Sequence, residues 1–195
     1  MIRLLIRSTI AVVVLTLVLG LAYPLLFTGF AQLVVPGRAD GSLIERDGVV
    51  VGSRLAAQAF TRPEYFHPRP TATDPEYNAA GTTFANLGPT NPDLATAVEE
   101  RVQAILELEG PHNPGLGVGD IPVDAVTTSG SGIDPHISPA NARLQTPRVA
   151  SERDLSVERV EELIDDHTDG RWLGIFGEPG VNVLQLNVAL DEETR

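Results

Sequence analysis

The sequence lacks two residue types entirely. Its 195 residues include no cysteine, and all 14 basic residues are arginine, so lysine is absent as well. The missing cysteine excludes a disulfide framework, a thiol nucleophile, a zinc finger and a lipid-modified N-terminal cysteine. Basic residues are also few, because 26 acidic residues give a net charge of −12. The chain therefore has no electrostatic footprint for nucleic acid, and anionic lipid surfaces would repel it.

Charge is missing from one long stretch near the N-terminus. No charged residue lies between Arg7 and Arg38, and residues 10–30 consist mostly of Val, Leu, Ile and Phe. A helix needs about 20 apolar residues to cross a bilayer. The run exceeds the roughly 7–15 residues of a signal-peptide core, and no A-x-A cleavage site follows it. We therefore predict an uncleaved transmembrane helix over residues 8–30, with a kink at Pro24.

The charges that flank this segment predict its orientation. Arg3 and Arg7 precede it, so residues 1–7 are expected in the cytoplasm, and residues 31–195 form an extracytoplasmic domain. The expected location is the inner cell membrane, crossed once. Small or hydroxylated residues recur along the span at Thr9, Thr16 and Gly20. Such a stripe lets another helix approach closely, so Thr16 and Gly20 are the predicted packing face.

Residues 31–195 read as a single α+β domain. Asp47-Gly48 between two apolar stretches predicts a β-hairpin. Cap residues followed by amphipathic patterns predict helices that begin after Asn91, Ser138 and Ser156, with the first ending at Gly110 and the second kinked or broken at Pro147. In the third helix Val157, Val160, Leu163 and Ile164 are expected inward. Residues 121–129 and 181–190 are expected to be strands.

The stretch VTTSGSGIDPHISPANA, residues 126–142, combines serines, an aspartate and a histidine. The candidate residues are Ser129, Ser131, Gly132, Asp134 and His136. A nucleophilic serine needs a base and an oxyanion hole, and neither serine lies in a G-x-S-x-G elbow. Asp134 and His136 could instead begin a metal site with His67, although the spacing offers no further ligand.

The structural interpretation of this stretch explains more of its residues. Asp134-Pro135 and Ser138-Pro139 are turn or cap pairs, and Gly130 and Gly132 free the backbone. Ser, Thr and Asp side chains can bond the loop's own amides. We therefore predict a stiff, self-bonded loop that presents a shape. A secondary candidate loop contains Tyr65, Phe66, His67 and Arg69, with aromatic rings packed inward and prolines stiffening the rim.

Several segments together resemble a known family. They are a span ending in YPLL, then DGSLIERDGVVVGSRLAAQAF, YFHPRPTAT, NLGPTNPDL, VTTSGSGIDPHISPANA, QTPRVASER and GEPGVNVLQLNVALD. In this order, and over most of the chain, they resemble the C subunits of the Kdp-type potassium-transporting P-type ATPases of bacteria and archaea.

The resemblance implies a non-catalytic accessory subunit of a high-affinity potassium uptake complex. Its implied partners are a channel-like potassium-translocating subunit, a P-type ATP-hydrolysing subunit and a small membrane peptide. It also implies a catalytic chaperone that raises the ATP affinity of the hydrolysing subunit. ATP and potassium are then handled by the complex, and no cofactor is assigned to this chain. The sequence contains no D-K-T-G motif and no P-loop. The alternatives are a membrane-anchored extracytoplasmic hydrolase and a solute-binding module.

Overall fold

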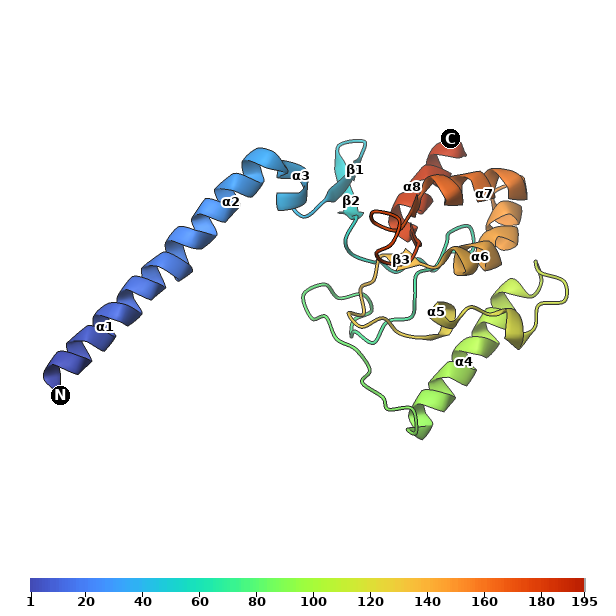
Figure 1. Cartoon of the computed structure of the whole chain (residues 1–195). Coiled ribbons are helices and arrows are strands. Elements are labelled where there is room, and N and C mark those ends of the chain that lie inside the picture. The colour runs from blue at the N-terminus through green and yellow to red at the C-terminus, as the bar shows by residue number, and fades with distance from the viewer. Residues whose placement is uncertain (195) are drawn as a thin grey trace. The chain divides into compact units, whose positions relative to one another are not determined.

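The computed structural model describes residues 1–194. The chain divides into two compact units, one from Met1 to Val51 and one from Gly52 onward. An apolar helix is followed by a domain of mixed helix and sheet, which confirms the α+β class (Figure 1). The expected domain boundaries at the membrane stay predictions.

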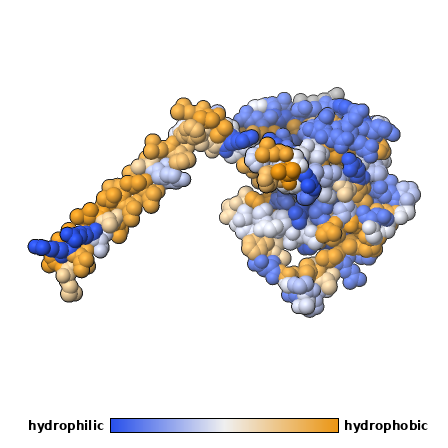
Figure 2. Space-filling model, in the orientation of Figure 1, coloured by the Kyte–Doolittle hydropathy of each residue, from blue (hydrophilic) through white to orange (hydrophobic). Residues whose placement is uncertain are grey.

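The first unit is dominated by one apolar helical rod. It consists of α1 (Ile2–Leu17), a π-helical turn η1 (Val18–Ala22) and α2 (Tyr23–Val34). An 18-residue window of this rod has a mean hydropathy of 2.6, and none of the window's residues is buried within the protein. Figure 2 shows most of the rod as hydrophobic, with blue atoms near its N-terminal end. By length and composition the rod can cross a membrane.

The sequence predicts a kink at Pro24, and the structure has the wider π turn just before it. Pro24 has no N–H and its ring crowds the carbonyl four residues earlier. In η1 the Tyr23 N–H bonds to the carbonyl of Val18, five residues back. A π turn of this kind accommodates the proline without ending the helix.

A short helix, α3 (Pro36–Ala39), leads into a hairpin of β1 (Leu43–Arg46) and β2 (Val49–Ser53). Asp47 and Gly48 connect the strands with φ of 51° and 76°. Positive φ at both central residues is the requirement of a type I′ turn, so the hairpin prediction is confirmed.

The second unit packs helices around a small sheet. Its helices are α4 (Pro92–Glu109), the 3₁₀ turn η2 (Val118–Asp120), α5 (Val123–Val126), α6 (Pro139–Glu152), α7 (Val157–Asp166) and α8 (Val183–Glu193). Three short strands, β3 (His136–Ile137), β4 (Thr168–Asp169) and β5 (Gly180–Asn182), form an antiparallel sheet in the order β3-β5-β4. The core lies between this sheet and α6, α7 and α8, around Phe66, Ile137, Val160 and Val181.

The predicted caps of α4, α6 and α7 are confirmed. The side chains of Asn91, Ser138 and Ser156 each accept a hydrogen bond from an amide in the first turn. Within α7, Val160, Leu163 and Ile164 are buried as predicted, whereas Val157 is 40% exposed. Val157 is the first residue of the helix, where the chain has not yet reached the core.

Three element predictions were wrong. Residues 123–126 form one helical turn, in which Asp124 binds Ser138 and Asn141 at the start of α6, a tertiary contact that the sequence pattern does not show. Helix α6 continues through Pro147, so the break that was one of the two outcomes predicted there is wrong, whereas a kink stays a prediction. Only Gly180–Asn182 of the expected strand at 181–190 is extended, and α8 follows at once because the Asn182 side chain caps it by accepting from the Gln185 N–H.

Candidate functional site

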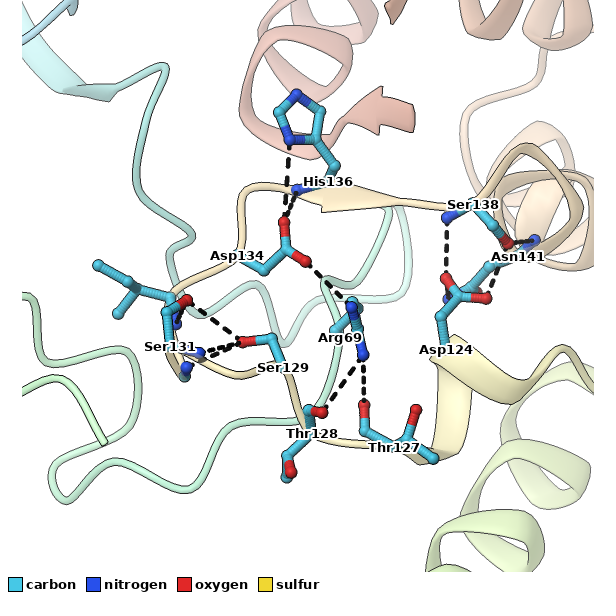
Figure 3. A network of polar contacts seen from close by, with 12 residues as sticks. Arg69, Asp124, Thr127, Thr128, Ser129, Ser131, Asp134, His136, Ser138 and Asn141 are labelled. Carbon is cyan, nitrogen blue, oxygen red and sulfur yellow. Dashed lines mark hydrogen bonds and ion pairs between the residues drawn. The ribbon is translucent and has the colours of Figure 1, made fainter. Parts of the chain in front are cut away.

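The loop between α5 and β3 is held by its own side chains (Figure 3). Ser129 is buried, and its Oγ accepts from the Gly132 N–H at 2.8 Å and lies 3.4 Å from Ser131 Oγ. Ser131 Oγ accepts from the Ile133 N–H at 3.2 Å, and Asp134 Oδ1 accepts from the His136 N–H at 3.0 Å. These are the self-bonded contacts that the composition predicts. Ser129 Oγ faces amides and a second hydroxyl, not an imidazole or a carboxylate.

Gly132 is where this loop meets a second segment. Its φ is +72°, and a Cβ built there would lie 2.7 Å from both Thr73 Cγ2 and the Thr83 carbonyl oxygen. Its own carbonyl accepts a hydrogen bond of 2.7 Å from Thr71 Oγ1. Glycine is thus required both for the left-handed backbone and for the close approach.

Arg69 joins the two candidate loops. Its guanidinium donates to Asp134 Oδ2 at 3.1 Å and to the Thr128 carbonyl at 3.2 Å. Burial by itself would raise the pKa of Asp134, but hydrogen bonds from His136 and Arg69 outweigh it and hold that pKa below its usual range. Both Arg69 and Asp134 were candidates in the sequence analysis, but the contact between them was not predicted.

His136 lies between two carboxylates. Its Nδ1 is 3.8 Å from Asp134 Oδ1, and its Nε2 is 3.4 Å from Asp169 Oδ2. The interaction with Asp134 raises the pKa of His136, against the opposing effect of burial. At these lengths the contacts are not well-formed hydrogen bonds, and they are ion pairs when the ring is protonated. Asp169 in turn binds Arg54 at 2.9 Å.

These groups line an open cleft of about 350 Å³ in the second unit. Its polar side chains are Arg69, Asp124, Asp134, His136, Ser138, Asp169 and Glu178. Both carboxylate oxygens of Asp124 already accept hydrogen bonds, from the Ser138 N–H and Oγ–H and from Asn141 Nδ2. The cleft can receive a polar or cationic group. The serine that lines it, Ser138, uses its hydroxyl to cap α6, accepting from the Asn141 N–H and donating to Asp124.

Side-chain amides of α6 and α8 hold the backbone of the secondary loop by hydrogen bonds. Phe66 is fully buried, and its N–H and carbonyl both bond to the side chain of Asn187 at 2.9 Å. The N–H and carbonyl of His67 bond in the same way to Gln145, at 2.8 and 3.1 Å. The Tyr65 hydroxyl donates to Asp191. Phe66 is therefore packed inward, and the loop has a fixed path.

The structure does not support a metal site built from His67 with Asp134 and His136. His67 Nε2 lies 3.2 Å from the Arg62 carbonyl, and the residue lines a different cavity. Burial, aided by the charge of Arg148, lowers the pKa of His67. Among residues 1–194, no group of three or more His, Asp or Glu side chains is arranged to hold a metal ion.

The remaining candidates, Thr16 and Gly20, lie in the first unit. Gly20 is inside the π turn, and a Cβ there would meet only Thr16 Cγ2, at 3.9 Å. The two residues therefore share a face of the rod, as their spacing predicts.

Sequence reasoning missed the most deeply buried charges. Arg148 of α6 and Glu109 of α4 form an ion pair of 2.9 Å, with side chains 1% and 3% exposed. Arg148 also donates to the carbonyls of Pro63 and Tyr65 at the start of the secondary loop. The sequence pattern gives no signal for this pair, because Arg148 shares a face of α6 with the polar Asn141 and Gln145 and its partner lies on another helix.

Comparison with known proteins gives a consistent result. The family described as "K+-transporting ATPase, c chain" (KdpC) matches residues 5–192. Proteins named potassium-transporting ATPase KdpC subunit are similar over nearly their full length. The one from Mycobacterium tuberculosis strain H37Rv is 50% identical over 189 residues, which cover 97% of this chain and 98% of that protein. The Rhodospirillum rubrum protein is 50% identical over 192 residues, covering 98% and 97%, and the Methylococcus capsulatus protein is 52% identical over 177 residues, covering 90% of each.

Proposed function

Because the chain belongs to the KdpC family, the c chains of K+-transporting ATPases, we propose that it is the non-catalytic, membrane-anchored accessory subunit of a high-affinity potassium uptake complex. Its work is to hold the complex together and to favour the conformation of the hydrolysing subunit that binds ATP tightly.

One observation carries the non-catalytic part of this proposal. The two serines that looked catalytic in sequence are occupied within their own loop, with Ser129 Oγ accepting from the Gly132 amide and Ser131 Oγ from the Ile133 amide. An active serine needs a base in hydrogen-bond contact, and His136 instead lies between two carboxylates. A loop that is stiff and satisfied in this way is suited to present a surface to a partner.

We propose three partners: a channel-like potassium-translocating subunit, a P-type ATP-hydrolysing subunit and a small membrane peptide. The apolar rod enters the inner membrane with residues 1–7 in the cytoplasm and the second unit outside. ATP and potassium are bound by the other subunits. The chain then acts on ATP affinity as a catalytic chaperone, by stabilising one conformation of the complex and not by touching the nucleotide.

The experiment compares assembled complexes with and without intact loop hydroxyls. Ser129→Ala and Ser131→Ala should co-purify with the other subunits and retain potassium-stimulated ATP hydrolysis. Complex prepared without this chain should need more ATP for half-maximal hydrolysis. Loss of hydrolysis in the serine variants with assembly intact would contradict the accessory role.

The cleft favours one alternative, a solute-binding module. Its volume of about 350 Å³ falls in the range of small-molecule pockets. A free-standing module would be recovered from native membranes without stable protein partners, whereas the accessory subunit should be recovered with an ATPase. A hydrolase would instead turn over an ester or peptide by itself.

A further inference from the structure

The segment between β4 and β5 is a hairpin with an apolar end. It rises from the core sheet, where Thr168 pairs with Val181 and Asp169 pairs with Gly180. Farther out the backbones of Trp172 and Phe176 exchange hydrogen bonds of 2.8 and 3.0 Å. We call Trp172, Leu173, Ile175 and Phe176 the apolar tip. Its position is fixed by a sheet whose central strand is buried.

The apolar tip is exposed. Trp172 is 69% exposed, Leu173 72%, Ile175 71% and Phe176 55%. Figure 2 shows a hydrophobic patch on a mostly hydrophilic face, where Figure 1 draws the dark red loop beside α8. Large apolar side chains grouped in this way, and left in water, mark a surface that binds something.

The tip is also held in shape before any partner arrives. Leu173 and Gly174 have φ of 53° and 78°, which turns the chain sharply, and Arg171 pairs with Glu178 at 2.6 Å across the base. The rings of Trp172 and Phe176 lie 5.6 Å apart. Little conformational entropy is therefore left to lose on binding.

We propose that the apolar tip inserts into the headgroup–acyl boundary of the bilayer that anchors the chain. The short chain segment between the apolar rod and the second unit supports the bilayer as the surface that the tip binds. Helix α2 ends at Val34 and the second unit begins at Gly52. The chain between them, residues 35–51, spans at most about 60 Å even when fully extended. The anchoring bilayer therefore stays within about this distance of the second unit, which gives its surface a high effective concentration for the tip.

The chemistry of the tip fits a lipid interface. Residues 170–177 contain no acidic residue, and their one charge, on Arg171, is paired with Glu178. Tryptophan is the side chain most typical of the membrane–water boundary. The rest of the second unit is acidic, so attraction to anionic lipid cannot drive insertion. Burial of apolar area drives it, and insertion should be at least as strong in zwitterionic as in anionic bilayers.

Trp172 is the only tryptophan in the chain, so it reports on its own position. The full-length chain is reconstituted in phosphatidylcholine vesicles with brominated acyl chains. We expect the brominated lipid to quench Trp172 emission and aqueous iodide to quench it weakly. The proposal rests on the membrane anchoring proposed above, which alkaline carbonate extraction tests separately.

Two variants serve as matched controls. In Trp172→Phe with Phe84→Trp, the probe moves to another half-exposed position of the second unit, and iodide should quench it while brominated lipid does not. Leu173→Asp with Ile175→Asp keeps the probe but charges the tip, and it should lose lipid quenching. Both replaced side chains are over 70% exposed, so the unfolding transition should not change.

The proposal fails if Trp172 in lipid vesicles is quenched by iodide and not by brominated lipid. It also fails if Trp172 is protected only when the other ATPase subunits are present, because the tip would then dock on protein.

Discussion

At the scale of single residues, Gly132 is the glycine of the loop between α5 and β3 that has no room for a side chain. Gly130 lies two residues away in the same loop, has ordinary φ, and a Cβ there would meet nothing within 4 Å. Composition could single out both glycines. Composition could not show which glycine faces Thr73 and the Thr83 carbonyl, because those residues lie 59 and 49 positions before Gly132 in sequence.

Alanine substitutions at Gly132 and Gly130 test whether the contact at Gly132 constrains the loop. Gly132→Ala should lower the free energy of unfolding by about 2 kcal/mol or more, since it combines a left-handed backbone with a steric clash. Gly130→Ala should change it by less than about 0.5 kcal/mol. Denaturation of the full-length chain, followed by Trp172 fluorescence, measures both. Equal effects in the two variants would show that the contact at Gly132 does not constrain the loop.

His136 makes the stability of this loop depend on pH. The pKa of His136 is raised by Asp134, so its contribution is complete below the unfolded value of about 6.5 and is lost as pH rises through the folded value. The pKa of Asp134 is lowered, so its contribution is lost as pH falls below about 4. The two effects together are most favourable between these limits.

We therefore expect the stability difference between wild type and His136→Gln to be largest near pH ~5.5 and to vanish toward pH ~9. The size should be on the order of 1 kcal/mol or less, because the ring is partly exposed. Asp169→Asn should reduce the difference in part. The pKa of His67 is lowered by folding, but His67 is present in both proteins, so its contribution to the stability difference cancels. A difference that grows with rising pH would contradict this account of the ion pairs.

At the scale of elements, local signals predicted helices better than the short strands. The caps at Asn91, Ser138 and Ser156 could be read from sequence because a side chain and the first turn suffice to form them. The stretch 181–190 alternates like a strand, and its helix is marked only by the cap at Asn182. Strands of two or three residues depend on tertiary pairing and leave no periodic pattern.

The same limit applies to the candidate site. The loop's residues and its internal bonds were predictable, because they involve neighbours in sequence. Its anchors, Arg69 to Asp134 and Asp169 to His136, join segments 65 and 33 residues apart. The buried pair of Arg148 and Glu109, which links α4 to α6, was missed for the same reason.

The helical rod offers a test of partner contact. Gly20→Leu should reduce co-purification with the other subunits, at a cost on the order of 1–2 kcal/mol of helix association. The rod itself has room for the side chain, since a Cβ at Gly20 contacts only Thr16. Gly29→Leu makes the same change where a Cβ meets nothing, so it should assemble normally. If both variants assemble like wild type, the face with Thr16 and Gly20 is not an interface.

At the scale of the whole molecule, charge is distributed very unevenly about the apolar rod. Arg3 and Arg7 lie in its first two turns, and the remaining 12 arginines follow it together with all 26 acidic residues, a net of −14. Positive charge close to the start of a span keeps that end in the cytoplasm, whereas acidic residues have little influence on orientation. We therefore expect the two N-terminal arginines to determine which side of the membrane the second unit occupies.

The absence of cysteine makes this orientation directly measurable, because each introduced thiol is unique. Ala80→Cys, at an exposed position of the second unit, should react with a membrane-impermeant maleimide on intact spheroplasts. Ile2→Cys should react only after the membrane is permeabilised, and the cysteine-free wild type should not react at all. Replacing Arg3 and Arg7 together by Gln should produce a mixture of orientations in the Ala80→Cys background, since the flanking charge bias is then removed. Labelling of Ile2→Cys on intact spheroplasts would place the second unit in the cytoplasm. An effect on ATP affinity could then arise by direct contact near the nucleotide, without transmission across the membrane.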